Sequence, residues 1–256
     1  MISKDELKKI AEAKRLSVEN CEKDYLLELI LFVIYSEFGN ALIFKGGTAL
    51  YKFYNLNRFS EDLDFTLNKK NFDFERMSKK ILFSLDRLGV VGKIKEFSKY
   101  RNEVNVKFNF IGPAYRGGRE RLAFVSLNIS LRERVCNFRR ETFIPYYREI
   151  PAFDVFVMDE KEILAEKVRA IFSRNKPRDV YDLWFLLKRG AEVDYNLINR
   201  KLKLVKMKFS RGSFFKKIGE KKDLWEKDLS QMLIGGAPSF DVVKKDIFDK
   251  IKSEVG

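Results

Sequence analysis

The stretch from Phe44 to Leu67, FKGGTALYKFYNLNRFSEDLDFTL, decides the fold of this chain. Its pattern predicts a strand that ends at two glycines, a short helix, a loop that contains an arginine, and a second strand. The second strand carries Asp62 and Asp64. Because alternate residues of a strand face the same side, we expect the two carboxylates to lie together, where a bound cation would offset their repulsion.

The paired glycines, Gly46 and Gly47, let the backbone approach a bound group closely. The helix that follows them begins with N–H groups that have no partner within the helix and can bind phosphate. Phosphate donors beside carboxylates for a divalent metal indicate chemistry on a nucleoside triphosphate. The alternative is a polar loop followed by an Asp-x-Asp without a ligand, and the glycine turn with its helix favours the functional interpretation.

The composition is that of a folded and strongly basic chain. Of the 256 residues, 45% are hydrophobic, and 51 Lys and Arg against 37 Asp and Glu give a formal net charge of +14. This hydrophobic content argues against a disordered chain, and the positive charge favours a polyanionic partner, either nucleic acid or an anionic membrane. No apolar segment is long enough to span a bilayer and no signal peptide is visible, so we expect a cytoplasmic protein without a membrane partner.

Histidine is absent, and the only cysteines are Cys21 and Cys136. The lack of histidine excludes Ser-His-Asp and Cys-His catalysis and most zinc and copper sites. Two distant cysteines indicate neither a disulfide framework nor a zinc site. Any metal must then be held mainly by oxygen ligands, so the expected cofactor is Mg²⁺ or Mn²⁺.

The apolar pattern changes its period along the chain. A helical spacing, or a near-continuous apolar run, predicts helices over residues 4–15, 24–38, 48–54 and 72–88. Alternation with period two predicts central strands over 104–110 and 124–131, besides the strands over 41–44 and 62–67. Short edge strands are expected over 139–144 and 154–158.

After residue 158 the pattern is helical. Helices are expected over 161–173 and 178–188, with three or four more in the tail, the last over 240–252. The sequence therefore predicts an α+β protein in which an α/β domain, residues 1–158, precedes a helical domain, residues 159–256.

Two motifs resemble a known family. The glycine pair, fourteen residues, and Asp-Leu-Asp are similar to the signature of polymerase-beta-like nucleotidyltransferases. The longer motif KGGTAL…RFSEDLDF resembles the AbiEii/AbiGii family of abortive-infection and toxin–antitoxin toxins. A second motif, EILAEKVRAIFSRNKPRDVYDLWFLL from Glu162 to Leu187, resembles the same family. The resemblance covers residues 24–187 and implies a nucleotidyltransferase-type mixed sheet with flanking helices, followed by a helical domain that completes the active-site cleft.

The resemblance and the strand pattern together assign roles to individual residues. Asp62 and Asp64 are expected to bind the metal, and Gly46, Gly47 and Thr48 to hold the triphosphate through backbone N–H groups and a hydroxyl. Further nucleotide-binding candidates are Ser60 and Lys45, with Arg58 near the same anion. For Lys45 and Arg58 a solvated or structural salt-bridge role is an equal alternative.

In the resembled family a lysine and an aspartate of the second motif belong to the active site, which implies catalytic roles for Lys167 and Asp182. A buried ion pair between these two residues is the structural alternative. Asp179 and Asp182 stand three apart on the expected helix and should share a face. Tyr181 and Trp184 are expected in the core rather than against a base.

The fold usually has a third carboxylate on a neighbouring strand. By alternation that position is Asn128, since Leu127 and Ile129 must face the core. An amide brings no charge, which leaves three accounts: one metal suffices, another acid such as Asp154 substitutes, or the site has decayed.

The resemblance and the basic charge favour a toxin enzyme that transfers a nucleotide from an NTP to RNA, with tRNA the favoured target, and that has a cognate antitoxin. Nucleotidylation of a protein hydroxyl and a non-catalytic nucleic-acid or antitoxin-binding module are the alternatives. Residues 188–222 hold twelve Lys and Arg and three Asp and Glu, a density that suits an RNA backbone or a solvated helix face, and Lys201, Lys203 and Lys206 are the RNA contacts expected there. Arg116, Arg119 and Arg121 form a further basic loop.

Overall fold

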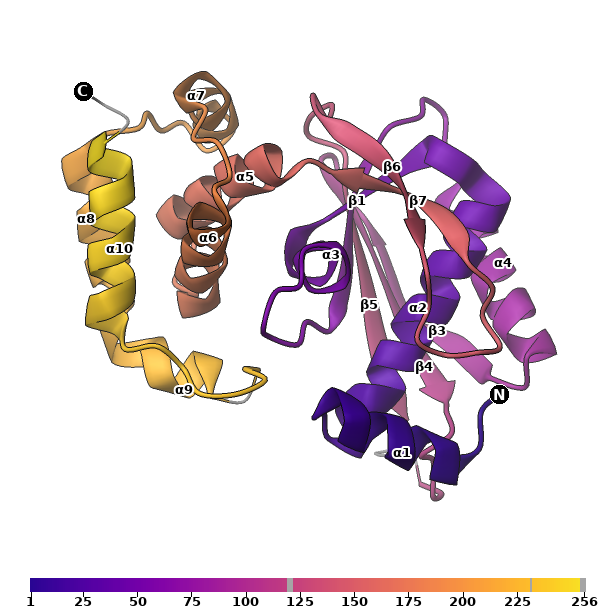
Figure 1. Ribbon diagram of the computed structural model, residues 1–256. Helices are drawn as coiled ribbons and strands as arrows, with labels where there is room; N and C mark the ends of the chain where they lie inside the picture. Colours follow the sequence, from indigo (N-terminus) through magenta and orange to yellow (C-terminus); the bar gives the residue numbers. More distant parts are fainter. Residues whose placement is uncertain (119–121, 231, 254–256) are drawn as a thin grey trace. The chain divides into compact units, whose positions relative to one another are not determined.

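The computed structural model describes residues 1–118, 122–230 and 232–253 (Figure 1). The chain divides into two compact units. The first contains residues 1–53 and 60–157, and the second contains residues 54–59 and 158–256. The short segment 54–59 thus leaves the first unit and belongs to the second.

The first unit contains one mixed sheet of seven strands in the order β3-β4-β5-β2-β1-β7-β6. The strands are β1 (Leu42–Lys45), β2 (Asp62–Leu67), β3 (Val91–Lys99), β4 (Glu103–Ile111), β5 (Ala123–Ser130), β6 (Phe138–Phe143) and β7 (Phe153–Met158). β2 runs antiparallel to β1 and parallel to β5, and β4 is antiparallel to both β3 and β5. The expected mixed sheet with flanking helices is confirmed.

Four α-helices belong to the described part of the first unit. They are α1 (Lys4–Lys14), α2 (Val18–Phe38), α3 (Gly46–Phe53) and α4 (Phe74–Arg87). A 3-10 turn, η1 (Gly39–Ala41), joins α2 to β1. α2 begins before the expected residue 24 because the Ser17 side chain accepts a hydrogen bond from the N–H of Asn20 and caps the helix there. α2 packs on β5 and α4 packs on β3.

The alternation of β4 and β5 is confirmed by burial. On β4 the four residues Val104, Val106, Phe108 and Phe110 are fully buried, and the residues between them are half-buried. Leu127 and Ile129 of β5 are also fully buried. One face of this half of the sheet therefore builds the core against the helices, and the other carries the polar side chains.

Two strand expectations were wrong. The alternation of β3 is hidden because five of its nine residues are exposed, four of them charged, and no strand was expected there. β7 lies between β1 and β6, so it is internal rather than an edge strand, and only β6 forms that edge. The buried Val155 and Val157 of β7 suit its internal position.

A buried ion cluster holds α3 against α2. The Lys52 Nζ atom donates to Asp24 Oδ1 at 2.5 Å and to Glu28, and Lys14 donates to the second oxygen of Asp24. Tyr147 also donates its hydroxyl to Asp24, at 3.0 Å. Burial alone would raise the pKa of Asp24, but the charges of Lys52 and Lys14 outweigh it and hold that pKa below its usual value.

The second unit is helical. Its elements are α5 (Glu160–Ser173), α6 (Pro177–Arg189), α7 (Tyr195–Lys203), α8 (Arg211–Gly219), η3 (Lys222–Leu224), α9 (Trp225–Leu229) and α10 (Phe240–Ser253). Tyr54 donates its hydroxyl to the carbonyl of Met158 at 2.8 Å, and the N–H of Phe59 donates to Met232 at 2.7 Å. These bonds fix the segment 54–59 within the unit. In the described part of the chain, no helix is long and apolar enough to cross a membrane.

We predict that Lys52→Met lowers the free energy of unfolding by about 3–5 kcal/mol, because Asp24 and Glu28 stay buried with a single remaining cation. Urea denaturation followed by circular dichroism measures this loss. Lys80→Met is the matched control, since the Lys80–Glu37 pair is solvent-exposed, and such a pair contributes only about 0–1 kcal/mol. Equal losses in the two variants would contradict a structural role for the cluster.

Candidate active site

The two acids of β2 lie on one face of the strand, as expected. Asp62 is exposed and Asp64 is half-buried, whereas Leu63 and Phe65 between and after them are fully buried in the core. This placement follows from the alternation of a strand whose apolar face is covered. Two carboxylates therefore project from neighbouring positions on the polar face of the sheet.

The first glycine of the turn is required by Asp64. Gly46 has φ +77°, in the left-handed region, and a Cβ built there would lie 2.5 Å from Asp64 Oδ2. Any other residue would push into the carboxylate as well as strain the backbone. The group that approaches the glycine closely is therefore the acid of the neighbouring strand, and this contact brings the N-terminal end of α3 against Asp64.

Asn128 lies beside Asp64, as strand alternation predicts. β2 and β5 are parallel, and Asp64 is paired with Asn128 in their register. The Nδ2 group of Asn128 donates to Asp64 Oδ1 at 3.0 Å, and Asn128 Oδ1 accepts from the hydroxyl of Ser126 at 3.2 Å. Asn128 thus presents a donor to the carboxylate, which orients Asp64, and its own oxygen is engaged elsewhere.

The nucleotide-binding candidates occupy the same corner of the first unit. Lys45 is the last residue of β1 and is paired with Asp64 in the register of β1 and β2. Its side chain is mostly buried, and Ser60 is half-buried before the start of β2. The Thr48 hydroxyl, which was expected to hold phosphate, donates instead to the carbonyl of Asp62 at 2.5 Å and ties α3 to β2.

The donor set fits a divalent cation with oxygen ligands. Asp62 and Asp64 offer carboxylates from one face of a strand, and hard cations such as Mg²⁺ prefer such ligands. Among the described residues, no group of three or more acidic, cysteine or histidine side chains is placed to hold a metal. The residues present therefore fit a site built on two carboxylates, without a third acid.

The second motif forms a buried ion cluster within the second unit. Lys167 Nζ lies 2.6 Å from Asp182 Oδ2 and 3.2 Å from Asp179 Oδ1. Arg58 donates through two nitrogens to the two oxygens of Asp182, each at 2.6 Å. The two aspartates share a face of α6, as expected, and the ion pair of the structural alternative is present.

Arg58 is therefore a partner of Asp182, with 3% of its surface exposed. Its placement near a phosphate was an expectation that the structure replaces with the salt-bridge alternative. Arg174 adds a bidentate pair to Asp179, at 2.7 and 2.8 Å. Burial opposes ionisation of Asp179, but Lys167 and Arg174 outweigh it and hold the pKa of that carboxyl at about 2.

Of the two aromatic residues of α6 that were considered as base contacts, Tyr181 lies in the core and Trp184 is half-buried. Tyr181 is 3% exposed and packs against Trp184 and Trp225, with ring centroids 5.5 and 6.5 Å away. The indole N–H of Trp184 donates to Asp246 at 2.8 Å. The prediction of a core position is confirmed for Tyr181, whereas Trp184 packs against it at the half-buried edge of the core.

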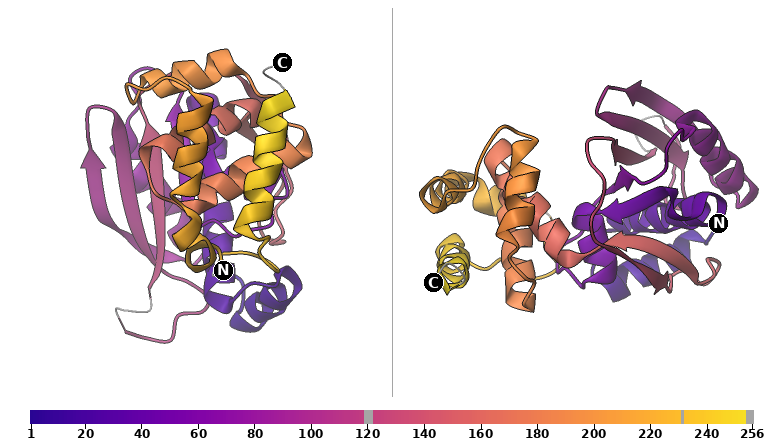
Figure 2. Two further views of the ribbon diagram at one scale, coloured as in Figure 1. Left: turned by 90° about the vertical axis from the view of Figure 1, so that its left-hand side faces the viewer. Right: turned by 90° about the horizontal axis from the view of Figure 1, so that it is seen from above.

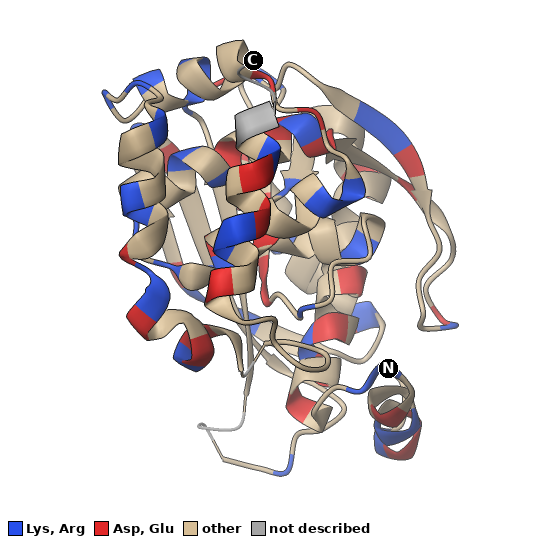
Figure 3. Ribbon diagram, turned by 60° about the vertical axis from the view of Figure 1, so that its left-hand side comes forward, with Lys and Arg blue, Asp and Glu red and all other residues tan. Residues whose placement is uncertain are grey.

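Lys201 is not an exposed RNA contact, which corrects the expectation for the basic segment. It is 1% exposed and its Nζ lies 2.7 Å from Glu162 and 3.4 Å from Glu166, so it ties α7 to α5. Lys203 and Lys206 are exposed. Figure 3 shows basic residues interspersed with acidic ones along the helices. Arg119 and Arg121 lie outside the described residues.

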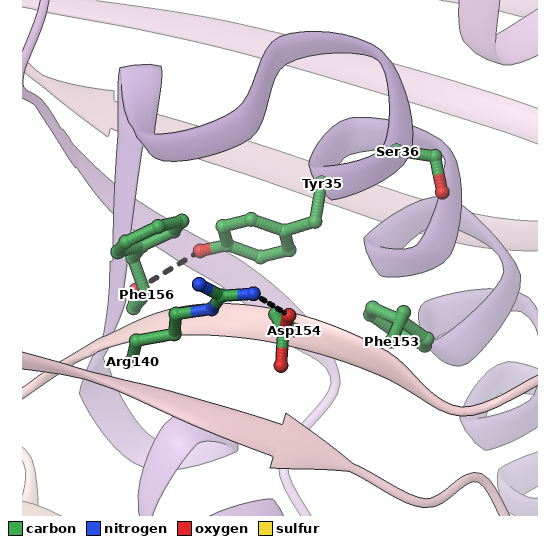
Figure 4. A pocket seen from close by; sticks show the side chains of 6 residues that line it. All are labelled: Tyr35, Ser36, Arg140, Phe153, Asp154 and Phe156. Atoms are coloured by element: carbon green, nitrogen blue, oxygen red, sulfur yellow. Dashed lines mark hydrogen bonds and ion pairs between the residues drawn. The ribbon is translucent and has the colours of Figure 1, made fainter.

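Asp154 does not supply the missing third acid. Its carboxylate is paired with Arg140 and accepts from the Thr142 hydroxyl at 3.0 Å, and β7, which carries it, is paired with β1 (Figure 4). It lines a cavity of about 260 Å³ in the first unit. The lining residues are Tyr35, Ser36, Arg140, Phe153, Asp154 and Phe156. Apart from Asp154 itself, none of these is one of the predicted site residues.

A family model described as "Nucleotidyl transferase AbiEii toxin, Type IV TA system" matches residues 29–246. The chain belongs to the AbiEii family. It is accordingly a nucleotidyltransferase toxin of a type IV toxin–antitoxin system, a class that implies an NTP substrate and an antitoxin partner. The match spans the acidic pair of β2 and the Lys167–Asp182 cluster. A comparison with curated proteins found no match.

Solved structures similar to this AbiEii-family chain share its fold. MenT4, a nucleotidyltransferase toxin of Mycobacterium tuberculosis H37Rv, is 17% identical, with 98% of this chain and 88% of MenT4 covered and a TM-score of 0.63. JHP933 from Helicobacter pylori is 20% identical, with 93% and 92% covered and a TM-score of 0.59. At this identity the likeness establishes the fold.

Sequence reasoning missed the residues that support the AbiEii motifs. Lys52 and Asp24 were read only as parts of helices, although a lysine on a short, largely apolar helix is a signal for a buried partner. The bond from Thr48 to Asp62 and the pairing of Arg58 with Asp182 cross between elements distant in sequence. No local pattern reports such contacts.

We predict that Asn128→Asp raises the affinity for Mg²⁺ or Mn²⁺, because a third carboxylate beside Asp64 adds charge that a cation offsets. Calorimetric titration of the metal into protein with a non-hydrolysable NTP measures the change. Asn109→Asp on β4 is the control, since its partners across the sheet are Lys93 and Phe124 and not Asp64. An affinity unchanged in Asn128→Asp but raised in Asn109→Asp would contradict the assignment.

The low pKa of Asp179 gives a pH prediction. The Asp179 carboxyl has a pKa of about 2 in the folded protein and its usual value of about 3.8 in the unfolded chain. Its contribution to the free energy of unfolding is therefore complete above about pH 5 and is lost as the pH falls toward 2. The free energy of unfolding of the wild type relative to Asp179→Asn should fall by about 2 kcal/mol over that interval. Urea denaturation at several pH values measures it. A difference that does not change with pH would contradict the shift.

Proposed function

We propose that the chain transfers a nucleotide from an NTP to RNA, with tRNA the favoured acceptor, at a metal site formed by Asp62 and Asp64. One observation carries the proposal: the two carboxylates share a face of β2, with the N-terminal end of α3 brought against them by the Gly46–Asp64 contact. Binding groups for the metal and the phosphates of an NTP thus come from one corner of a single unit.

Each residue of this corner has a proposed task. Asp62 and Asp64 hold a divalent cation, Mg²⁺ or Mn²⁺, and Asn128 keeps Asp64 oriented through its 3.0 Å hydrogen bond. A bound cation would offset the charge that develops on the phosphate oxygens. The backbone N–H groups at Gly47 and Thr48 bind phosphate at the start of α3, and Lys45 adds a positive charge. Ser60 contributes a hydroxyl at the edge of the corner.

Lys167 and Asp182 are proposed active-site residues on the strength of the family motif. Within the second unit the lysine is held between two carboxylates, and the positive charges of Arg58 and Arg174 hold the aspartates in turn. A lysine so held brings a positive charge at a fixed position. We propose that this charge contributes to nucleotide transfer.

RNA is the proposed acceptor because of charge. The formal charge of +14 favours a polyanion. The exposed Lys203 and Lys206 of the second unit remain candidates for backbone contacts, and Lys201 is no longer one. Protein hydroxyl groups are the alternative acceptor, and the experiment below distinguishes the two.

Purified protein is incubated with each α-labelled NTP, Mg²⁺ and a mixture of total RNA and cell protein, and the labelled polymer is identified by nuclease and protease digestion. We expect label in RNA. Asp64→Asn should reduce transfer by at least about 10²-fold, because charge compensation at the metal is lost. Asp154→Asn is the matched control, a carboxylate of the same sheet outside the site, and should keep near-normal transfer.

Full activity in Asp64→Asn would remove the proposed mechanism. Label that resists nuclease and is released by protease would move the acceptor from RNA to protein. Calorimetry with a non-hydrolysable NTP in the absence of any acceptor checks separately that nucleotide binding depends on Asp62 and Asp64.

A further inference from the structure

The polar side chains of the first unit continue in rows across the sheet, away from the acidic pair. The strand register places Asp64, Asn128, Asn105 and Ser98 in one row that runs from β2 through β5 and β4 to β3. The neighbouring row contains Asp62, Ser126, Lys107 and Glu96. Each row spans three strand spacings, or about 14 Å. Beyond the two aspartates, this polar face of the sheet consists mainly of amide, hydroxyl and lysine side chains.

A third row adds an aromatic ring and further positive charge. Phe124 of β5 is aligned with Asn109 of β4 and Lys93 of β3. The register of β3 shifts between Ile94 and Glu96, so Lys95 is the extra residue of a bulge. Its Nζ lies 5.3 Å from the centre of the Phe124 ring. The bulge therefore turns a lysine over the polar face.

This face is the side of the sheet that the helices of the first unit leave open. On the opposite side, β4 buries Val104 and Val106 completely, and Lys99 of β3 lies 5.9 Å from the ring of Phe74 at the start of α4. On the polar side, Lys93 and Lys95 are exposed and Asn105 is half-buried. Figure 2 (left) shows β3 and β4 with no helix of the first unit in front of them.

The chemistry of the open face matches an unpaired RNA strand. Lysines bind phosphates, an aromatic ring stacks on a base whatever its identity, and amides and hydroxyls bond to base edges and to 2′-hydroxyl groups. Lys107 is paired with Glu96 at 2.8 Å, and Glu103 of β4 is paired with Arg132 at 3.1 Å, so the uncompensated positive charge of β3, β4 and β5 on this face comes from Lys93 and Lys95. Among the described residues, Val91 and Ile111 are also exposed on this side, as one cross-strand pair at the end of β3 and β4. A single pair beside one ring is not the continuous apolar stripe that a protein helix needs.

We propose that this open face of β3, β4 and β5 holds the unpaired end of the RNA acceptor and leads it to the acidic pair. The inference rests on the proposed function, since it takes RNA as the acceptor. In this proposal Lys93, Lys95 and Phe124 bind the RNA. The face selects acceptors with single-stranded ends, because flat rows of side chains cannot follow a duplex groove. The face is continuous with Asp64 through Asn128.

The test uses a hairpin RNA with a short unpaired 3′ end and the same hairpin with a flush end. Binding of each is measured by fluorescence anisotropy for the full chain, for Lys93→Glu/Lys95→Glu and for Phe124→Ala. Lys99→Glu is the matched control, because it reverses a lysine on the same strand but on the helix-covered side. Thermal unfolding and calorimetry with a non-hydrolysable NTP show that each variant is folded and binds nucleotide.

We expect both face variants to bind the RNA with the unpaired end roughly tenfold more weakly, as loss of a stacked base or two phosphate contacts predicts. Binding of the flush hairpin should change less, and Lys99→Glu should behave as the wild type. Loss of affinity in Lys99→Glu equal to that in Lys93→Glu/Lys95→Glu, or equal loss for the two RNAs, would overturn the proposal.

Transfer assays separate this inference from the function beneath it. If the wild type labels RNA and the face variants label it with unchanged KM for the acceptor, the open face is not the acceptor site, and the proposed function stands. If the wild type labels no RNA, the proposed function and this inference both fail.

Discussion

The site depends on the absence of one side chain. Gly46 leaves room for the carboxylate of Asp64, which would otherwise lie 2.5 Å from a Cβ. Because the backbone takes a left-handed conformation there, β1 turns directly into α3, and the start of that helix meets the acidic strand. Thr48 then bonds to the Asp62 carbonyl, and Lys52 enters the buried cluster with Asp24. The turn and the acids are therefore one structural feature, and neither can be placed without the other.

Buried charge supports both motifs of the AbiEii family, at some expense in desolvation. In the first unit, Asp24 and Glu28 hold the lysine of α3, and in the second, Asp179 and Asp182 hold the lysine of α5. Buried ion pairs contribute little net stability, but the loss of one partner leaves a charge that the interior cannot solvate. Such clusters tolerate few alternative arrangements. Their value is that they fix the position of α3 and of Lys167, which packing of apolar side chains alone would leave less defined.

The sequence predicted what periodicity and short motifs can report. It placed Asp62, Asp64 and Asn128 on one face, because alternation is a local property of a strand with one covered side. It also placed Asp179 and Asp182 on one helix face through their spacing, and it gave an ion pair between Lys167 and Asp182 as the structural alternative to the roles that the resemblance implies. It failed where partners are remote or local contrast is weak. β3 has exposed residues on both of its faces, so its sequence does not alternate clearly. Lys201 lies in a segment rich in lysine and looks like a surface residue, although it is paired with Glu162, 39 residues earlier in the sequence. The role of Arg58, which lies in the loop between α3 and β2, likewise depends on Asp182 of α6.

The excursion of residues 54–59 has a consequence for biosynthesis. This segment belongs to the unit that the chain completes last, and the partner of Arg58 lies 124 residues later in the sequence. On a ribosome Arg58 is synthesised 124 residues before Asp182, so their ion pair cannot form until that part of α6 has been made. A fragment that stopped at the end of the sheet would lack Asp182 and Met232, to which Arg58 and Phe59 donate hydrogen bonds. The loop between α3 and β2 therefore gains these contacts only after the helices of the second unit that provide them have been synthesised.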